Sequence, residues 1–338
     1  MIANCHSVPP EWAPQAALWV GWPHLRDEWG DAFDQARLEI AAFVRAAARF
    51  QPVSIACGSE DARKSAKSTL SDLDGNVTFE AIPTGDIWLR DTGPIVAIDG
   101  AGEPRALTFR FNGWGGKYVM PGDTETSAAM AMRAGLPIIA HDFVLEGGAI
   151  DVDGAGRLLT TRQCLLNPNR NSGWTGAEVE AALHSAFDID EIVWLDQGLI
   201  GDHTDGHIDN LARFVGPGHV LCQRPSGVDD PQAAVLMAAE TLLRASGLKV
   251  TTLPSPGRIV GYDGETLPAS HMNFTLINGA VMLPFYEPVF SDEAAAVLST
   301  LFPDREIVSC AATAILHGGG SLHCMTREIP QIGPVAVT

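Results

Sequence analysis

A hairpin pattern recurs along this chain, and it restricts the possible folds more than any other feature. In each copy a short apolar run leads into a turn rich in glycine, aspartate or asparagine, and a second apolar run follows, which is a strong signal for a β-hairpin. The turns begin at Asp99, Asp153, Gly216 and Asn278. They lie roughly 60 residues apart, a period typical of a fold built from repeated units.

Amphipathic helical patterns fill the intervals between the hairpins. Helices are expected over residues 31–49, 178–187, 230–246 and 292–301. Each repeat is therefore a mixed α/β unit, and the chain accommodates about five of them in a single domain spanning residues 1–338. The fifth unit would combine residues 17–23 with residues 318–330, so that the two ends of the chain close a ring and leave no sheet edge exposed.

The composition allows a large core and restricts the partners. Of the 338 residues, 46% are hydrophobic, which is ample for one large domain. Acidic residues outnumber basic ones by 41 to 22, giving a net charge of −19. That balance argues against a nucleic-acid partner and suits a small cationic substrate, although it could equally serve solubility.

The cysteines and the N-terminus indicate a cytoplasmic protein. Six cysteines are scattered without a paired motif, so reduced thiols are expected rather than a disulfide framework. They are Cys5, Cys57, Cys164, Cys222, Cys310 and Cys324. The sequence shows no signal-peptide pattern and no apolar run of about 18–20 residues, so no membrane association is expected.

Three carboxylates occupy similar places relative to the repeated hairpins. Asp91, Glu146 and Asp209 each lie seven or eight residues before a hairpin turn, and Asn273 lies five before its own. If the units surround a common axis, these side chains converge on it. The alternative is that acidic residues precede strands here only as turn formers.

A thiol and an imidazole could join those carboxylates. Cys324 follows three consecutive glycines, which let the backbone approach a ligand closely, although most isolated cysteines are inert core residues. Its activation needs a nearby cation, which the substrate itself could supply. His207 and Asp209 would face the same side of a strand. His207 is then either a general acid/base or, with His203, Asp205 and Asp209, a metal ligand.

Two tryptophans complete the candidate site. Trp88 and Trp114 are either core residues or walls that stack on a flat cation. Arg90 could pair with its neighbour Asp91 and so keep that carboxylate from a substrate. The loop at residues 167–170 has no role that the sequence reveals. Together these groups suit a guanidinium, which is flat, pairs with carboxylates and carries an electrophilic carbon open to a thiolate.

Segments spread over nearly the whole chain resemble the agmatine deiminases (agmatine iminohydrolases), a group related to the bacterial peptidylarginine deiminase. The resembling segments are residues 10–19, 86–94, 111–116, 146–148, 160–170, 206–210 and 318–324. The resemblance implies the pentein fold, a five-fold pseudosymmetric α/β propeller, in agreement with the number of repeats.

The resemblance also implies roles for individual residues. Cys324 would be the nucleophile and His207 the acid/base, with Glu146 holding the substrate and the histidine. Hydrolysis would pass through an S-amidino-cysteine intermediate and convert agmatine into N-carbamoylputrescine and ammonia. The substrate-binding residues would be Asp91, Asp209, Trp88, Trp114, His203 and Gly319. Neither a metal nor an organic cofactor is implied, and a homodimer is common among such proteins.

One departure leaves the substrate open. Many members of the group carry an acidic residue where this chain has His203, so arginine, peptidylarginine and other guanidino compounds remain alternatives to agmatine. Three other functions are also compatible with the residues: a metallohydrolase, an amidinotransferase, and a binding module for cationic ligands without catalysis.

Overall fold

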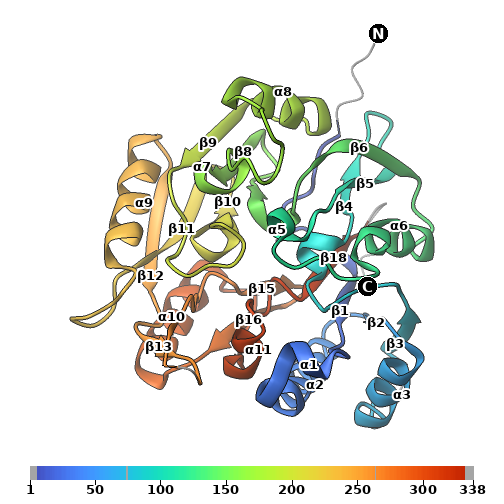
Figure 1. The fold of residues 1–338 in the computed structure, drawn as a ribbon. Helices are drawn as coiled ribbons and strands as arrows, with labels where there is room; N and C mark the ends of the chain where they lie inside the picture. Colours follow the sequence, from blue (N-terminus) through green and yellow to red (C-terminus); the bar gives the residue numbers. More distant parts are fainter. Residues whose placement is uncertain (1–5, 74, 263, 332–338) are drawn as a thin grey trace.

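The computed structural model describes residues 6–73, 75–262 and 264–331, and it shows a mixed α/β protein (Figure 1). Five of the six sheets in the described residues share one strand pattern. In each of them two antiparallel strands are followed by a third strand, which pairs in parallel with the second; the antiparallel strands form a hairpin in four sheets and come from the two chain ends in the fifth, which also has a fourth strand. A parallel pair needs a crossover connection, and helices supply it. The repeated hairpin unit expected from the sequence is therefore confirmed.

Four of these units follow one another along the chain. The first has β4 (Ile95–Ile98), β5 (Pro104–Arg110), α6 (Asp123–Arg133) and β6 (Ile138–Val144). The second has β7 (Ile150–Val152), β8 (Arg157–Thr161), α8 (Gly176–Ala186) and β9 (Glu191–Leu195). The third has β10 (Ala212–Gly216), β11 (His219–Arg224), α9 (Ala233–Ala245) and β12 (Lys249–Pro254). The fourth has β15 (Thr275–Ile277), β16 (Ala280–Phe285), α10 (Pro288–Leu301) and β17 (Glu306–Ala311).

The fifth unit joins the two ends of the chain, as expected. Its elements are β18 (Thr326–Pro330), β1 (Gln15–Gly21), α2 (Phe33–Ala47), β2 (Val53–Cys57), α3 (Glu60–Thr69) and β3 (Val77–Ala81). In this sheet β18 pairs antiparallel with β1, from Gln15 opposite Pro330 to Val20 opposite Thr326. Figure 1 shows the five units following one another in chain order around the centre of the view.

All four expected helices are present, with bounds that differ for local reasons. The helix expected over 230–246 begins only at Ala233 because the Asp230 carboxylate accepts the backbone N–H of Gln232 and so holds a turn there. The helix expected over 292–301 begins earlier, at Pro288, a residue that suits the first turn of a helix.

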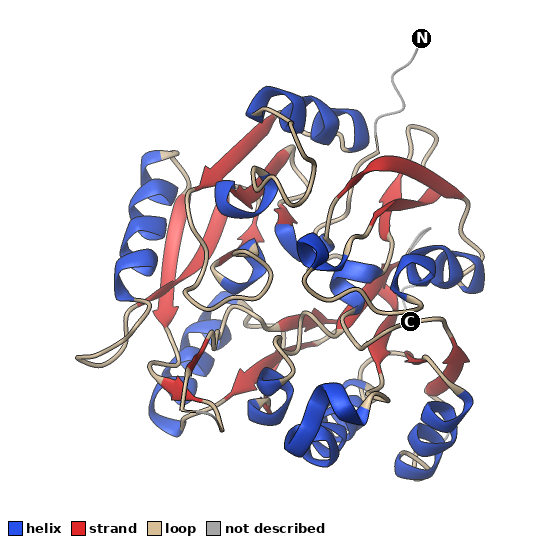
Figure 2. Ribbon diagram, viewed as in Figure 1, coloured by secondary structure: helices blue, strands red, loops and turns tan. Residues whose placement is uncertain are grey.

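Apolar residues fill the space between sheets and helices. In α2, the side chains of Ile40, Phe43, Val44 and Ala47 are fully buried at helical spacing, and they share a cluster with Leu18 of β1. Figure 2 shows the longer helices mostly toward the outside of the view, with the strands closer to its centre. Among the described helices, none has the length and apolar character that crossing a bilayer requires.

Short elements connect the units and place the site described below. They are α1 (Arg26–Trp29), η1 (Gly30–Ala32), α4 (Leu89–Thr92), α5 (Gly113–Gly116), η2 (Gly147–Ala149), α7 (Arg162–Leu165), η3 (Ile208–Asn210) and α11 (Thr313–His317), where η denotes a 3₁₀ helix. A small separate hairpin consists of β13 (Ile259–Val260) and β14 (Thr266–Leu267).

Candidate active site

A cavity of ≈ 210 Å³ brings most of the predicted site residues together. Six of the nine predicted residues line it: Trp88, Asp91, Trp114, His203, Gly319 and Cys324. The other three are fully buried: His207 lies next to Asp91, Asp209 lies next to Cys324, and Glu146 lies behind them beside His207.

The glycine-rich segment after α11 carries Cys324 into the cavity wall. Gly319 has φ +104, which glycine adopts without strain, and a Cβ at Gly320 would lie 2.6 Å from the Trp88 ring. The Cys324 sulfur accepts a hydrogen bond from Asn273 Nδ2 at 3.2 Å, while Asn273 Oδ1 accepts the Cys324 backbone N–H at 3.2 Å. Asn273 therefore fixes both the backbone and the thiol of Cys324.

The free protein holds Cys324 as a thiol. Burial, together with the carboxylates of Asp209 and Asp91, raises the pKa of Cys324 well above its ordinary value. Since the thiolate is the reactive form of a cysteine, these surroundings keep the sulfur unreactive near neutral pH. A cation bound beside the sulfur would favour the thiolate.

The rate at which iodoacetamide alkylates Cys324 is accordingly expected to rise with pH, and to be still rising between about pH 8 and about pH 10. Deprotonation populates the reactive form only as the pH approaches the raised pKa. Mass spectrometry of the Cys324 peptide after timed quenching measures this rate, with the peptide of buried Cys310 as an internal reference. A rate that is already level at neutral pH would contradict a thiol ground state.

The three predicted carboxylates enter the site from equivalent places. Asp91 lies in α4 just before β4, Glu146 directly precedes η2 before β7, and Asp209 lies in η3 before β10. Each is thus carried by a short helical turn that leads into the first strand of a unit. A Cβ built on Gly148 would lie within 3.2 Å of both Asp91 Oδ1 and Asp209 Oδ2, so the two carboxylates are near neighbours.

The strand expected at His207 and Asp209 was wrong. His207 and Asp209 do not lie on a strand, because Asp205 and Gly206 adopt φ +63 and +88 and turn the chain before η3. The backbone N–H of His207 donates to Thr204 Oγ1 at 3.0 Å within this turn. The strand begins only at Ala212.

The possible ion pair between Arg90 and Asp91 is absent. Arg90 instead lies 2.7 Å from Glu328 Oε2. The Asp91 carboxylate accepts the backbone N–H of Gly148 at 2.9 Å and the Trp114 Nε1–H at 2.9 Å. These two bonds orient Asp91 in the cavity wall without neutralising its charge.

His207 is surrounded by groups that favour its cation. Burial alone would lower the pKa of His207, but Asp91, Cys164 and Glu146 together raise it well above its usual value. The Nδ1 atom lies 3.6 Å from Asp91 Oδ1. A protonated imidazole at this position can donate a proton to a leaving group.

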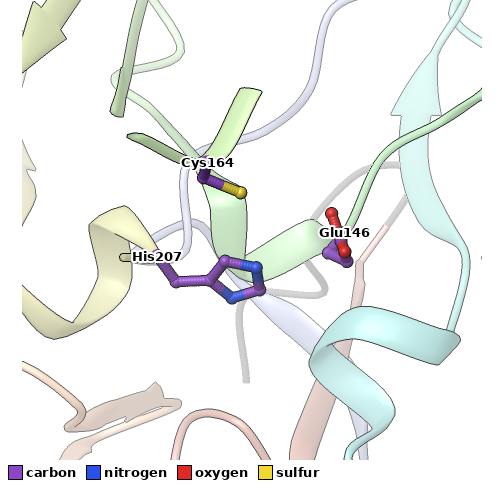
Figure 3. A group of neighbouring side chains, drawn as sticks. All are labelled: Glu146, Cys164 and His207. Carbon is purple, nitrogen blue, oxygen red and sulfur yellow. The ribbon is translucent and has the colours of Figure 1, made fainter. Parts of the chain in front are cut away.

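One group of potential metal ligands lies within the site. Among the described residues, Glu146, Cys164 and His207 bring one donor atom each within 4.8 Å of one another, and their side chains point together in Figure 3. Glu146 Oε1, however, already accepts Arg170 Nε at 2.6 Å, so a dication would meet a guanidinium charge there. The alternative ligand set built on His203 and Asp205 is wrong, since those side chains form no such cluster.

Arg170 gives a structural role to the loop at residues 167–170. Its guanidinium donates to Glu146 Oε1, to Asp205 Oδ2 at 2.6 Å and to the Thr204 carbonyl at 2.7 Å. The side chains of Arg170 and Glu146 are both fully buried. Arg170 therefore links the Glu146 segment to the loop that precedes His207.

Replacing Arg170 with methionine is expected to lower the free energy of unfolding by about 3–5 kcal/mol, because it leaves Glu146 as an unpaired buried charge. Urea unfolding followed by circular dichroism measures the change. Arg63→Met, which breaks an exposed pair with Glu60, is the matched control and should change stability little. An equal loss of stability from the two substitutions would show that burial does not determine how much the Arg170–Glu146 pair stabilises the protein.

Aromatic rings form the walls of the cavity. The rings of Trp29 and Trp88 are stacked with centroids 5.8 Å apart. Trp114 has φ +52, a conformation that side-chain-bearing residues rarely adopt and that often marks functional sites. Near the cavity mouth, Tyr118 Oη lies 3.3 Å from Nδ1 of exposed His203. These walls suit a flat cation with an extended tail.

Three residues of the site were not predicted as such. Asn273 had a signal, since it occupies the fourth repeat position, but it was not assigned a contact with Cys324. Arg170 belonged to a loop without a role. Cys164 lay in a resembling segment, yet nothing in the sequence placed it beside His207.

Comparisons with known proteins show which family the chain belongs to. The family model described as Porphyromonas-type peptidyl-arginine deiminase matches residues 7–330. Agmatine deiminase of Pseudomonas aeruginosa (strain LESB58) is 35% identical to this chain, across 97% of the chain and 96% of that protein.

Solved structures of agmatine deiminases superpose closely on the chain. A cysteine-to-serine variant from C. jejuni with substrate bound has a TM-score of 0.92 and 30% identity, and the match covers 98% of each chain. The enzyme of Enterococcus faecalis has a TM-score of 0.90 and 27% identity, with 98% and 99% covered. The chain therefore belongs to the Porphyromonas-type peptidyl-arginine deiminase family, with the agmatine deiminases among its relatives.

Proposed function

We propose that this protein hydrolyses agmatine to N-carbamoylputrescine and ammonia through a covalent intermediate on Cys324. One observation carries the proposal: a buried sulfur lies in the wall of an aromatic cavity with Asp91 beside it, while Asp209 lies 3.8 Å from that sulfur. A cationic group with an electrophilic carbon is what such a site would bind and attack.

Binding places the guanidinium between carboxylates and aromatic rings. Asp91 and Asp209 would accept its N–H groups, and Asp209 Oδ1 is buried without a hydrogen-bond partner in the described structure. Glu146 Oε2 is likewise unpartnered and buried. Unsatisfied buried acceptors are costly, so a ligand with several N–H donors would be strongly favoured. Trp88 and Trp114 would flank the planar group.

Covalent attack would then follow. The bound cation favours loss of the Cys324 proton to solvent, and the resulting thiolate sulfur forms a bond to the guanidinium carbon. The C–N bond to one terminal nitrogen breaks, and that nitrogen leaves as ammonia after taking the proton of His207. The product on the protein is an S-amidino-cysteine.

Hydrolysis completes the cycle. His207, now neutral, removes a proton from water, and the hydroxide oxygen bonds to the amidino carbon. The hydroxyl group then loses its proton as the carbonyl forms and the C–S bond breaks, which returns the electron pair and the proton to Cys324 as a thiol and releases the ureido product. The net reaction consumes one water and yields one ammonia, without a redox step.

The same proposal covers the fold and the substrate. We infer that the five similar sheets form a pentein propeller within one domain, because they share a strand pattern and the chain ends pair in one of them. Agmatine is favoured over arginine because the agmatine deiminases are its relatives across nearly the full length. His203 at the cavity mouth would lie near the distal end of the substrate.

Product analysis over a panel of guanidino compounds tests the proposal. Purified protein is incubated with agmatine, arginine, a peptidylarginine and 4-guanidinobutyrate, and ammonia and ureido products are quantified together. Equal amounts of ammonia and N-carbamoylputrescine from agmatine, unchanged by EDTA, are expected. Amidino transfer to added glycine without ammonia would instead indicate an amidinotransferase, and no turnover of any compound would refute the proposal.

A further inference from the structure

The two carboxylate oxygens of Asp209 have different surroundings. Oδ2 lies 2.7 Å from Nδ1 of His323, whereas Oδ1 is buried and has no hydrogen-bond partner in the described structure. His323 therefore holds Oδ2, which also lies 3.8 Å from the Cys324 sulfur, while Oδ1 keeps its capacity to accept a hydrogen bond. The proposed reaction does not use His323, although it directly precedes Cys324.

His323 is itself held on its other side. Its Nε2 lies 3.0 Å from Oε2 of Glu11, and its backbone N–H donates to Asn273 Oδ1 at 2.9 Å. Glu11 is anchored in turn, since Arg213 pairs with its Oε2 and the Leu276 N–H donates to its Oε1 at 2.8 Å. The imidazole therefore cannot turn without breaking contacts to segments far apart in the sequence.

These contacts form a chain of three groups, Glu11, His323 and Asp209, whose side chains are all buried. Hydrogen bonds to charged groups inside a protein are strong and fix orientation. A carboxylate that binds a guanidinium must be held within a fraction of an ångström and a small angle of the productive geometry. The chain supplies that restraint through Oδ2, the oxygen that lies 3.8 Å from the Cys324 sulfur.

We propose that His323 is a positioning residue for the substrate: it holds Oδ2 of Asp209, and Glu11 holds His323, so that the Asp209 carboxylate stays beside the Cys324 sulfur in the orientation that binds the guanidinium. The inference rests on the proposed function in one respect, namely that Asp209 contacts the guanidinium. It adds a role for the histidine next to the nucleophile and for Glu11, which lies in the segment before β1.

Two amide substitutions separate the two ends of the imidazole. The side-chain amide nitrogen of asparagine lies close to the position of Nδ1, whereas that of glutamine reaches the position of Nε2. His323→Asn can therefore still donate to Asp209, and His323→Gln can donate only toward Glu11. The two variants have similar polarity, so a difference between them reports on the Asp209 contact.

Binding is measured by calorimetry with agmatine in a Cys324→Ala background, where no turnover interferes. His323→Gln is expected to raise Kd at least about tenfold, the loss typical of a hydrogen bond to a charged group, and His323→Asn is expected to raise it only about threefold or less. In an Asp209→Asn background, His323→Gln should have no further effect, because its role acts through Asp209. Equal Kd values for the two variants, or additive effects with Asp209→Asn, would overturn the proposal.

Glu11→Ala provides a second test that does not depend on the folding of the His323 variants, because it removes every partner of His323 Nε2 that Glu11 supplies. It should raise Kd when Asp209 is present and leave Kd unchanged in the Asp209→Asn background. A role in stability alone would lower the melting temperature of Glu11→Ala and leave Kd unchanged in both backgrounds. If the Cys324→Ala protein fails to bind agmatine at all, the proposed function fails instead, and the two failures are thus distinguishable.

Discussion

Replacing Cys324 with alanine is expected to abolish ammonia release from agmatine, with a fall in kcat of at least about a thousandfold. The sulfur lies in the cavity wall, and no other described cysteine lines that cavity. Without a nucleophile, water would have to attack a resonance-stabilised cation directly. Coupled detection of ammonia, calibrated against heat-inactivated protein, measures the residual rate.

Two further variants make that result specific. Cys310→Ala removes another buried thiol from β17, away from the cavity, and should retain activity. Cys324→Ser should lose turnover but still bind agmatine in calorimetry, since the carboxylates and tryptophans remain. Persistence of about a hundredth of the activity in Cys324→Ala would contradict covalent catalysis by this thiol.

The sequence predicted the repeated framework because that framework is encoded locally. Alternating apolar residues, turn residues and helical periodicity are patterns within short stretches of sequence. Each hairpin and each crossover helix shows the pattern expected for it. The pairing of β1 with β18 is a long-range contact, but the repeat count required a partner for the terminal segments. Closure of the chain ends was therefore predictable although no local signal specifies it.

The errors arose where local geometry departed from the periodic pattern. The strand expected at His207 was replaced by η3 because Asp205 is left-handed, a conformation that only a minority of aspartates adopt. Arg90 and Asp91 were considered as a pair because they are adjacent in sequence. Both lie in α4, and neighbouring residues of a helical turn do not face each other.

The groups around the proposed catalytic residues were the least predictable part of the site. Arg170 reaches Glu146 from 24 positions away, and Asn273 reaches Cys324 from 51 positions away. Such contacts depend on how whole units pack, which spacing within one segment does not reveal. The residues proposed to carry the chemistry could be named from the sequence, whereas the residues that contact and orient them required coordinates.

Gly148→Ala is expected to lower kcat/KM by about a hundredfold or more, because a methyl group would enter the centre of the site. The added Cβ would lie 2.6 Å from His207 Nδ1, 2.8 Å from Asp91 Oδ1 and 3.2 Å from Asp209 Oδ2. Contacts this short force the imidazole and the carboxylates to move. Gly148 does not have a positive φ, so alanine can adopt the backbone, and the effect comes from the methyl group rather than from strain in the main chain.

Gly176→Ala is the matched control for the same chemical change. A Cβ there meets no atom within 4 Å, and the residue begins α8, where alanine should stabilise the helix by up to about 1 kcal/mol. Its kcat/KM should equal that of the wild type. Steady-state kinetics with agmatine and thermal unfolding of both variants complete the comparison. A folded Gly148→Ala protein must displace His207 or Asp91 to make room for the methyl group. If its kcat/KM nevertheless equals that of the wild type, catalysis does not require these side chains where the structure places them.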